Sequence, residues 1–128
     1  SQNLFISPSA IAQQAALAAF EPESLATAQG YRERFREQGD YLLGELTRLG
    51  FSFPAMPDGA FYGYADVCAL TDDSYGFCLR LCDEAGVLMT PGRDFGQVAP
   101  ERYVRVSYTK PLSALAEGVR RIEQFLKS

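Results

Sequence analysis

The sequence predicts an α+β fold in which a small mixed or antiparallel sheet is covered by helices. Residues 103–108 alternate between two sets of side chains, which is typical of a strand with one buried face. Residues 112–126 repeat apolar side chains at helical spacing, as in a helix that packs on a core. The predicted order is helix, helix, strand, strand, helix, strand, strand, helix, which fits a sheet layer covered by a helix layer.

The composition restricts the possible functions. The 128 residues suffice for one domain with a modest core. The net charge of −4 argues against a nucleic-acid partner, because phosphate contacts need a basic surface. The arginines of residues 32–37 alternate with glutamates and predict a solvated helix face. No apolar run approaches the roughly 20 residues of a membrane span. No basic segment precedes the apolar N-terminal stretch, so we expect no signal peptide and a cytoplasmic protein.

The cysteines and the missing histidine exclude several kinds of site. Cys78 and Cys82 are spaced to share a helix face and could form half of a metal site, but the chain contains no histidine to help complete one. We therefore predict no metal and interpret these residues and Cys68 as buried thiols in a reducing cytosol. Without histidine the chain cannot hold a Ser-His-Asp triad, a Cys-His pair or an HExxH zinc site. Glycine-rich phosphate-binding motifs are also absent from the sequence.

The first part of the chain predicts two helices. Ser7 is a candidate N-cap for a helix over residues 8–20, with proline at its first position. This helix carries no charge before Glu21, so we expect it to be covered by a segment outside this chain, by a second copy of the chain, or to be poorly ordered. An amphipathic helix follows over residues 22–49, and Gly50 is its predicted C-cap.

The remaining elements are shorter. Turn residues, N-cap candidates and glycines mark their ends. In chain order we predict a short strand at 51–53, a turn at 57–59, a strand over 60–67, a helix over 75–85 capped by the residues 72–74 and ended by Gly86, a strand over 87–90 stopped by Pro91, a loop over 94–102, the strand 103–108 and a final helix from 110–111 to 126.

Arg105 is the candidate binding residue. In the alternating strand Val104 and Val106 point to one face, and Arg105 points to the other with Tyr103 and Ser107. An arginine held there by a rigid strand is either a surface charge or an anion clamp. Its planar guanidinium can bind a carboxylate or a phosphate through two parallel hydrogen bonds. The strand taken alone leaves both interpretations open.

Several motifs resemble those of one protein family, in the family's order and spacing. They resemble class I/II, fold-type I aminotransferases, the aspartate aminotransferase-like enzymes that depend on pyridoxal 5'-phosphate (PLP). The matching segments cover essentially the whole chain and are the alanine-rich stretch 7–19, PDGAFY at 57–62, AGVLMTPG at 85–92 with FG at 95–96, YVRVSY at 103–108 and the closing helix around 115–122.

The resemblance implies a position in a larger enzyme. In the family this region is the C-terminal small domain, so residues 1–21 are expected to be the tail of the large PLP domain, 22–50 the helix that links the domains, and 51–128 the small domain. The parent would move an amino group between an amino acid and a 2-keto acid, with an upstream large domain and as a homo-oligomer. By its match to the motif, Arg105 would bind the α-carboxylate of the substrate.

The same resemblance implies that this chain lacks the reaction centre. The PLP lysine, the aspartate partner of the pyridine nitrogen and the phosphate-binding residues lie upstream in the family. Lys110 and Lys127 are the only lysines, and neither matches the Schiff-base motif. We therefore expect no catalytic and no cofactor-binding residue here, no bound PLP and no activity of the chain alone.

The loop at Arg93 departs from the family pattern, and two other interpretations of the chain stay open. Arg93 and Asp94 depart from the family pattern, so the loop at the edge of the cleft is expected to differ. The alternatives to a piece of an aminotransferase are a free-standing module that binds a small carboxylate through Arg105 and a dimerisation module. An upstream reading frame with the PLP lysine would favour the first interpretation, whereas a genuine short frame would favour the others.

Overall fold

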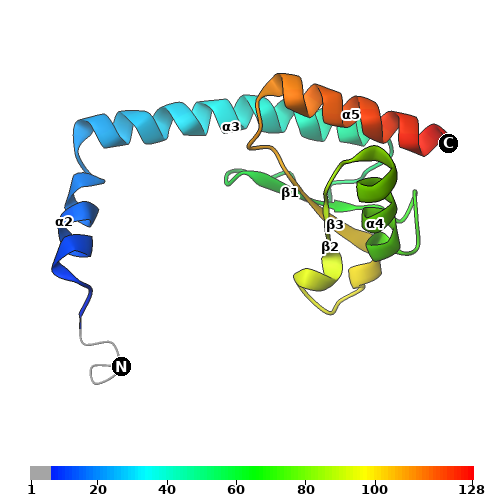
Figure 1. Cartoon of the computed structure of the whole chain (residues 1–128), viewed down its shortest axis with the longest axis horizontal. Coiled ribbons are helices and arrows are strands. Elements are labelled where there is room, and N and C mark those ends of the chain that lie inside the picture. The colour runs from blue at the N-terminus through cyan, green and yellow to red at the C-terminus, as the bar shows by residue number, and fades with distance from the viewer. Residues whose placement is uncertain (1–6) are drawn as a thin grey trace. The chain divides into compact units, whose positions relative to one another are not determined.

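A computed structural model describes residues 7–128, and the chain forms two compact units (Figure 1). The first unit ends at Arg34 and the second comprises Phe35–Ser128. The described elements, in chain order, are α2 (Ala10–Ala18), α3 (Pro22–Arg48), β1 (Tyr62–Asp66), α4 (Ser74–Ala85), β2 (Thr90–Pro91), the 3₁₀ helices η1 (Gly92–Asp94) and η2 (Pro100–Arg102), β3 (Tyr103–Ser107) and α5 (Leu112–Lys127).

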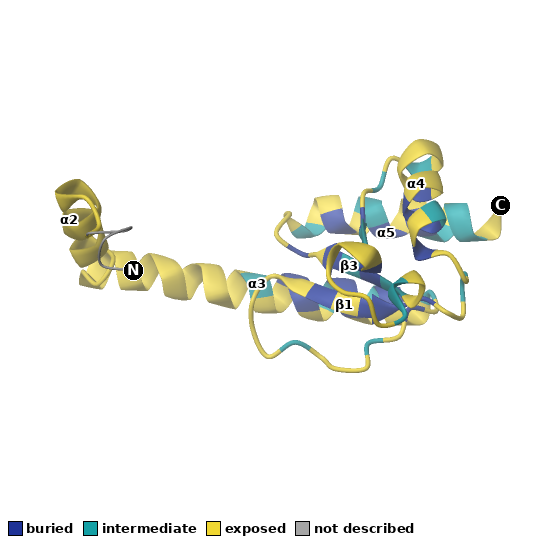
Figure 2. Ribbon diagram, turned by 90° about the horizontal axis from the view of Figure 1, so that it is seen from below, coloured by how far each residue is buried: buried dark blue, intermediate teal, exposed yellow. Residues whose placement is uncertain are grey.

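The first unit contains α2 and the beginning of α3. The predicted N-cap of α2 is wrong by two residues, because the Oγ of Ser9, not of Ser7, accepts the backbone N–H of Ala12 at 3.2 Å. The helix also ends at Ala18, before the predicted Phe20. Residues 7–34 are all exposed, as Figure 2 shows for α2. The covering of this helix by a further segment or a second copy stays a prediction.

The second half of α3 belongs to the second unit and ends as predicted. Its buried positions recur every three or four residues, which gives the helix one apolar face. Gly50 has a φ of +99°, a left-handed conformation that few other residues adopt. The N–H of Phe51 then donates to the carbonyl of Leu46 at 3.1 Å, which closes the helix end.

The sheet is antiparallel, with β3 in the centre in the order β1-β3-β2. Arg105 pairs with Tyr64 on β1 and with Thr90 on β2. The expected strand at 51–53 is reduced to one bridge, between Ser52 and Asp66. The strand expected over 87–90 is also shorter, because the N–H of Val87 still bonds to the end of α4 and only Thr90–Pro91 reach β3.

The other boundaries follow the sequence closely. Asp73 caps α4 by accepting the N–H of Gly76 at 3.0 Å, and Gly86 ends the helix with a φ of +64°. The predicted loop 94–102 contains η2 and the end of η1. The central strand and the final helix form where the alternation and the helical repeat predicted them.

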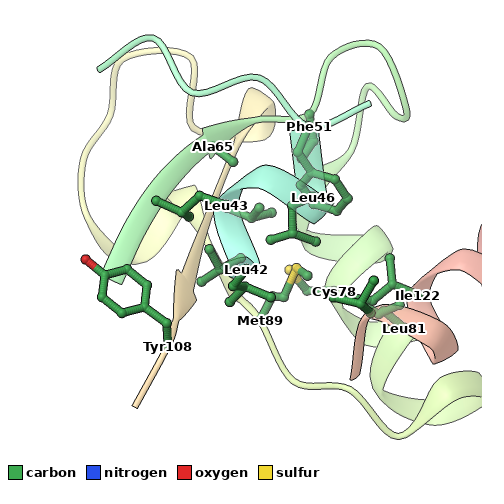
Figure 3. Close-up of a cluster of buried hydrophobic side chains, with 14 of the residues drawn as sticks. Leu42, Leu43, Leu46, Phe51, Ala65, Cys78, Leu81, Met89, Tyr108 and Ile122 are labelled. Atoms are coloured by element: carbon green, nitrogen blue, oxygen red, sulfur yellow. The ribbon is translucent and has the colours of Figure 1, made fainter. Parts of the chain in front are cut away.

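One face of the sheet carries the core (Figure 3). Ala65, Val104 and Val106 on the strands join a single buried cluster with residues from the three helices α3, α4 and α5. Figure 3 shows Leu42, Leu43 and Leu46 of α3 beside Cys78 and Leu81 of α4 in this cluster. The α+β fold is thereby confirmed, with helices on the core side of the sheet.

The cysteine prediction is only partly correct. Cys78 is buried, and this burial, with the nearby charges of Asp94 and Asp73, raises its pKa to about 11. Cys68 and Cys82 are exposed instead, because they lie on a loop and on the outer side of α4. In residues 7–128 no cluster of three or more His, Cys, Asp or Glu side chains could hold a metal ion. Within the same range, no helix is long and apolar enough to cross a membrane.

Candidate functional site

The outer face of the sheet holds the predicted binding residue. Val104 and Val106 of β3 are buried, so the residue between them must point to the opposite side. That residue is Arg105, and its side chain is half-buried. The neighbouring outward residues of β1 are Tyr62 and Tyr64. The strand alternation therefore places an arginine beside tyrosines on the face opposite the core.

The guanidinium of Arg105 rests on aromatic rings. Its Cζ lies 4.6 Å from the ring centre of Phe95 and 5.5 Å from that of Tyr62. Such cation–π contacts stabilise the group through the ring faces. In the part of the chain that the structure describes, Arg105 has neither an ion pair nor a hydrogen bond from its side chain, unlike the ion-paired Arg48, Arg102, Arg120 and Arg121. Its N–H donors are thus free of acceptors among these residues.

Three of the rings on this face contact one another. Tyr64 stacks on Tyr103 with ring centres 5.0 Å apart and nearly parallel planes, at 13°. Phe95 meets the same Tyr64 edge to face at 6.1 Å. Partial burial, and secondarily the charge of Tyr103, raise the pKa of Tyr64, so its ring is neutral at physiological pH. We call Tyr62, Tyr64, Phe95 and Tyr103 the aromatic platform.

The acid in the outward row of β1 is already paired. Asp66 forms an ion pair with Arg102 and accepts the N–H of Cys68 at 2.9 Å. The hydrogen bond from Cys68, with the contribution of Arg102, holds the pKa of Asp66 below its usual 3.8. The carboxylate is therefore ionised at neutral pH, and its charge is offset by Arg102. This pairing leaves the charge of Arg105 uncompensated on the same face.

The loop that carries Phe95 is held at both ends. A side chain at Gly92 would place a Cβ only 2.5 Å from the carbonyl oxygen of Pro100, so only glycine allows this approach. The Oγ of Ser74 on α4 donates to the same carbonyl at 3.0 Å. These contacts fix the two 3₁₀ turns against each other and against α4. Phe95 leaves the first turn and reaches the guanidinium of Arg105.

Sequence reasoning proposed Arg105 as the binding residue but did not predict its aromatic partners. Two signals were available: Phe95 belongs to the FG motif, and Tyr62 and Tyr64 alternate in β1 with the buried Gly63. Neither signal alone shows that the rings meet Arg105, because Phe95 lies ten residues away along the chain on a loop.

The two lysines do not form a cofactor site. Lys110 is exposed beyond β3. Lys127 lies at the end of α5, where it bonds to Glu123 at 3.1 Å and its side chain is 72% exposed. Neither lysine is among the partners of Arg105 or of the aromatic platform in the described residues. These two lysines do not fit PLP, which needs an enclosed lysine and a phosphate cradle, and the absence of a cofactor-binding residue stays a prediction.

Comparison with known proteins identifies the family. Residues 1–122 match the family "Aminotransferase class I and II". The chain is 40% identical over 126 residues to the valine–pyruvate aminotransferase of Mycobacterium tuberculosis, covering 98% of this chain and 32% of the relative. The chain belongs to the class I and II aminotransferases. It is also 33% identical over 118 residues to the probable N-acetyl-LL-diaminopimelate aminotransferase of Bacillus subtilis, covering 92% of this chain and 29% of that relative.

Solved structures of aminotransferases share the fold. The crystal structure of an aminotransferase from M. tuberculosis superposes with a TM-score of 0.90 at 38% identity, over 98% of this chain and 33% of that chain. An aspartate aminotransferase mutant from Thermus thermophilus gives a TM-score of 0.81 at 35% identity, over 96% and 33%. Class I and II aminotransferases use PLP. This aminotransferase chain spans about a third of the length of its relatives.

Proposed function

We propose that this chain is the C-terminal small domain of a PLP-dependent aminotransferase and that Arg105 binds the carboxylate of the substrate. The parent enzyme moves an amino group between an amino acid and a 2-keto acid. Residues 1–21 then belong to the large domain, 22–50 form the linking helix and 51–128 the small domain. The observation that carries the proposal is the guanidinium of Arg105, free of acceptors among residues 7–128, on the outer face of β3.

The surroundings of Arg105 suit a carboxylate. The central strand is bonded on both sides, which fixes the backbone of the arginine. Phe95 and Tyr62 support the faces of the guanidinium and use none of its N–H groups, so the planar edge is available for two parallel hydrogen bonds. Holding the substrate at one end in this way restricts its orientation at the reaction centre.

A carboxylate clamp serves both halves of a transamination. The amino acid and the 2-keto acid differ at the α-carbon but share the α-carboxylate, so the same arginine can bind each in turn. The relatives are named for different substrates, valine with pyruvate in one and aspartate in another. A residue that reads the shared carboxylate is compatible with all of them, and selection among side chains must then come from other parts of the enzyme.

The test is the substitution Arg105→Leu in the full-length aminotransferase. Losing a charge-assisted pair costs roughly 1.5–3 kcal/mol, so we expect kcat/KM to fall about 10- to 150-fold while PLP stays bound. The matched control is Arg80→Leu, since Arg80 also rests on a ring, at 5.4 Å from Phe125, but lies on α4 and contacts no ring of the platform in the described residues. Unchanged kcat/KM in Arg105→Leu would remove this residue from the site.

A further inference from the structure

We propose that Arg93 is a positioning residue for Arg105 and acts through Phe95. Its side chain fixes the first 3₁₀ turn against α4, the turn fixes the ring of Phe95, and this ring orients the guanidinium of Arg105. The structural part of the proposal concerns only these three side chains and their supports. Its consequence for catalysis rests on the function proposed above.

The first step is the contact of Arg93 with α4. The Cζ of Arg93 lies 3.1 Å from the ring centre of Tyr75, so the guanidinium lies over the ring. Tyr75 is in the first turn of α4 and is 38% exposed. Although Asp94 is adjacent in sequence, the described structure gives Arg93 no ion pair with it or with any other acid. The stack on Tyr75 is thus the contact that ties this arginine to the helix.

The second step leads from the turn to Phe95. The N–H of Phe95 donates to the carbonyl of Gly92 at 2.9 Å, and this bond closes the turn around Arg93. A displacement of Arg93 therefore moves the backbone that carries the Phe95 ring. The ring itself is 47% exposed, and among the described residues it meets Tyr64 edge to face and the guanidinium of Arg105. Its position depends on the turn as well as on its own packing.

The third step leads from Phe95 to Arg105. The Phe95 ring is the nearer of the two rings that support the guanidinium, at 4.6 Å against 5.5 Å for Tyr62. The contact of Gly92 with Pro100 anchors the ends of the loop. Residues 96–98, which follow Phe95, are exposed, with Val98 at 90%. The contact of Arg93 with Tyr75 is consequently the side-chain contact that supports the turn next to Phe95.

Nuclear magnetic resonance of the 128-residue chain tests the structural part. The guanidinium of Arg105 lies over the Phe95 ring, so ring currents should move its Nε–H signal upfield from the value of free arginine; Phe95→Leu identifies that contribution. We expect Arg93→Met to move the signal back toward the free value and Arg93→Lys to preserve most of the wild-type shift, because an ammonium also binds a ring face. Tyr75→Leu removes the same stack from the other side and serves if Arg93→Met does not fold.

The control variant is Arg80→Met, which removes the contact between Arg80 on α4 and Phe125 on α5, neither of which belongs to the platform. We expect no change of the Arg105 signal in this variant. An Arg105 signal that stays in place in both Arg93→Met and Tyr75→Leu would overturn the proposal. An equal shift in Arg80→Met would do the same, since it would show a general loosening of the fold.

Kinetics of the full-length enzyme test the catalytic consequence. We expect Arg93→Met to lower kcat/KM about two- to fivefold, the value of one exposed cation–π contact, and to have no further effect in an Arg105→Leu background. Equal effects in both backgrounds would show that Arg93 acts independently of Arg105. If Arg105→Leu itself loses nothing, the proposed function fails, whereas the resonance of Arg105 still decides whether Arg93 positions it.

Discussion

Three arginines of the second unit differ in what they contact. Arg102 pairs with the carboxylate of Asp66, Arg93 lies on the ring of Tyr75, and Arg105 lies on rings with its donors free of described acceptors. An arginine bonded to an acid has already used the edge that would bind a substrate. An arginine that only rests on a ring still has this edge available. At the scale of single residues, partner type therefore separates the acid-paired Arg102 from the ring-supported Arg93 and Arg105, and only Arg105 of these two lies on the central strand.

The pairing of Asp66 predicts a dependence of stability on pH. The pKa of Asp66 is lowered in the folded state, so its ionised carboxylate stabilises the fold above about pH 4. This stabilisation is lost as the pH falls through the lowered pKa. We expect Asp66→Asn to reduce the free energy of unfolding by about 1 kcal/mol at pH 7 and to approach the wild type in acid. Urea unfolding at pH 7 and at several values below pH 4 measures this.

The control for this comparison is Asp83→Asn on the exposed side of α4, an acid with no ion pair among residues 7–128. It should leave the unfolding free energy within about 0.5 kcal/mol of wild type at each pH. A difference between Asp66→Asn and wild type that stays the same from neutral to acid pH would show that the charge of Asp66 contributes nothing.

Among the helices, α3 combines an exposed half with a buried half. Every residue of Pro22–Arg34 is exposed, and the buried positions begin at Gln38. Gln38 is 3% exposed, and its Oε1 is buried without a hydrogen-bond partner in the described part of the chain. A polar atom in that state has lost its water without a replacement, which costs about 1–3 kcal/mol.

This position of α3 offers a stabilising substitution. Gln38→Met keeps the length and nearly the volume of the side chain and removes the unsatisfied oxygen, so we expect the free energy of unfolding to rise by about 1 kcal/mol. Thermal or urea unfolding measures it. The matched change Gln124→Met, on the exposed side of α5, should bring no gain. A less stable Gln38→Met protein would mean that the amide has a favourable role in the core.

At the scale of the whole molecule, the core and the first unit differ. All residues of the buried cluster lie between Leu42 and Ile122, whereas residues 7–34 contribute none. The chain also covers about a third of the length of its relatives. Both facts are in line with the proposal that this chain is one part of a larger aminotransferase.

We therefore expect the chain by itself neither to retain PLP nor to transaminate. Lys110 is exposed and Lys127 is bonded to Glu123 on the surface, so neither offers an enclosed amine beside a phosphate cradle. The measurement is incubation with PLP, dialysis and a visible absorbance spectrum, with amino transfer to pyruvate as a second assay and the full-length enzyme as control. One retained cofactor per chain, or turnover, would show that this chain is a complete enzyme.

The sequence by itself determined the features that depend on local periodicity and backbone sterics. The alternation around Arg105 predicted a strand with this residue on the outer face, and the structure has it there. The helical repeat predicted α5, and Gly50 and Gly86 marked helix ends because each needs a left-handed backbone. The family motifs also identified the aminotransferase resemblance, since their order and spacing are properties of the chain itself.

Only the tertiary structure decided which side chains meet. Phe95 comes under Arg105, and Arg93 over Tyr75, because loop, helix and sheet pack together, and no short-range pattern encodes such contacts. The exposure of Cys68 and Cys82 and the reduction of β2 to two residues depend equally on packing. Periodicity sets the face on which a side chain lies, whereas its neighbours on that face come from segments distant in sequence.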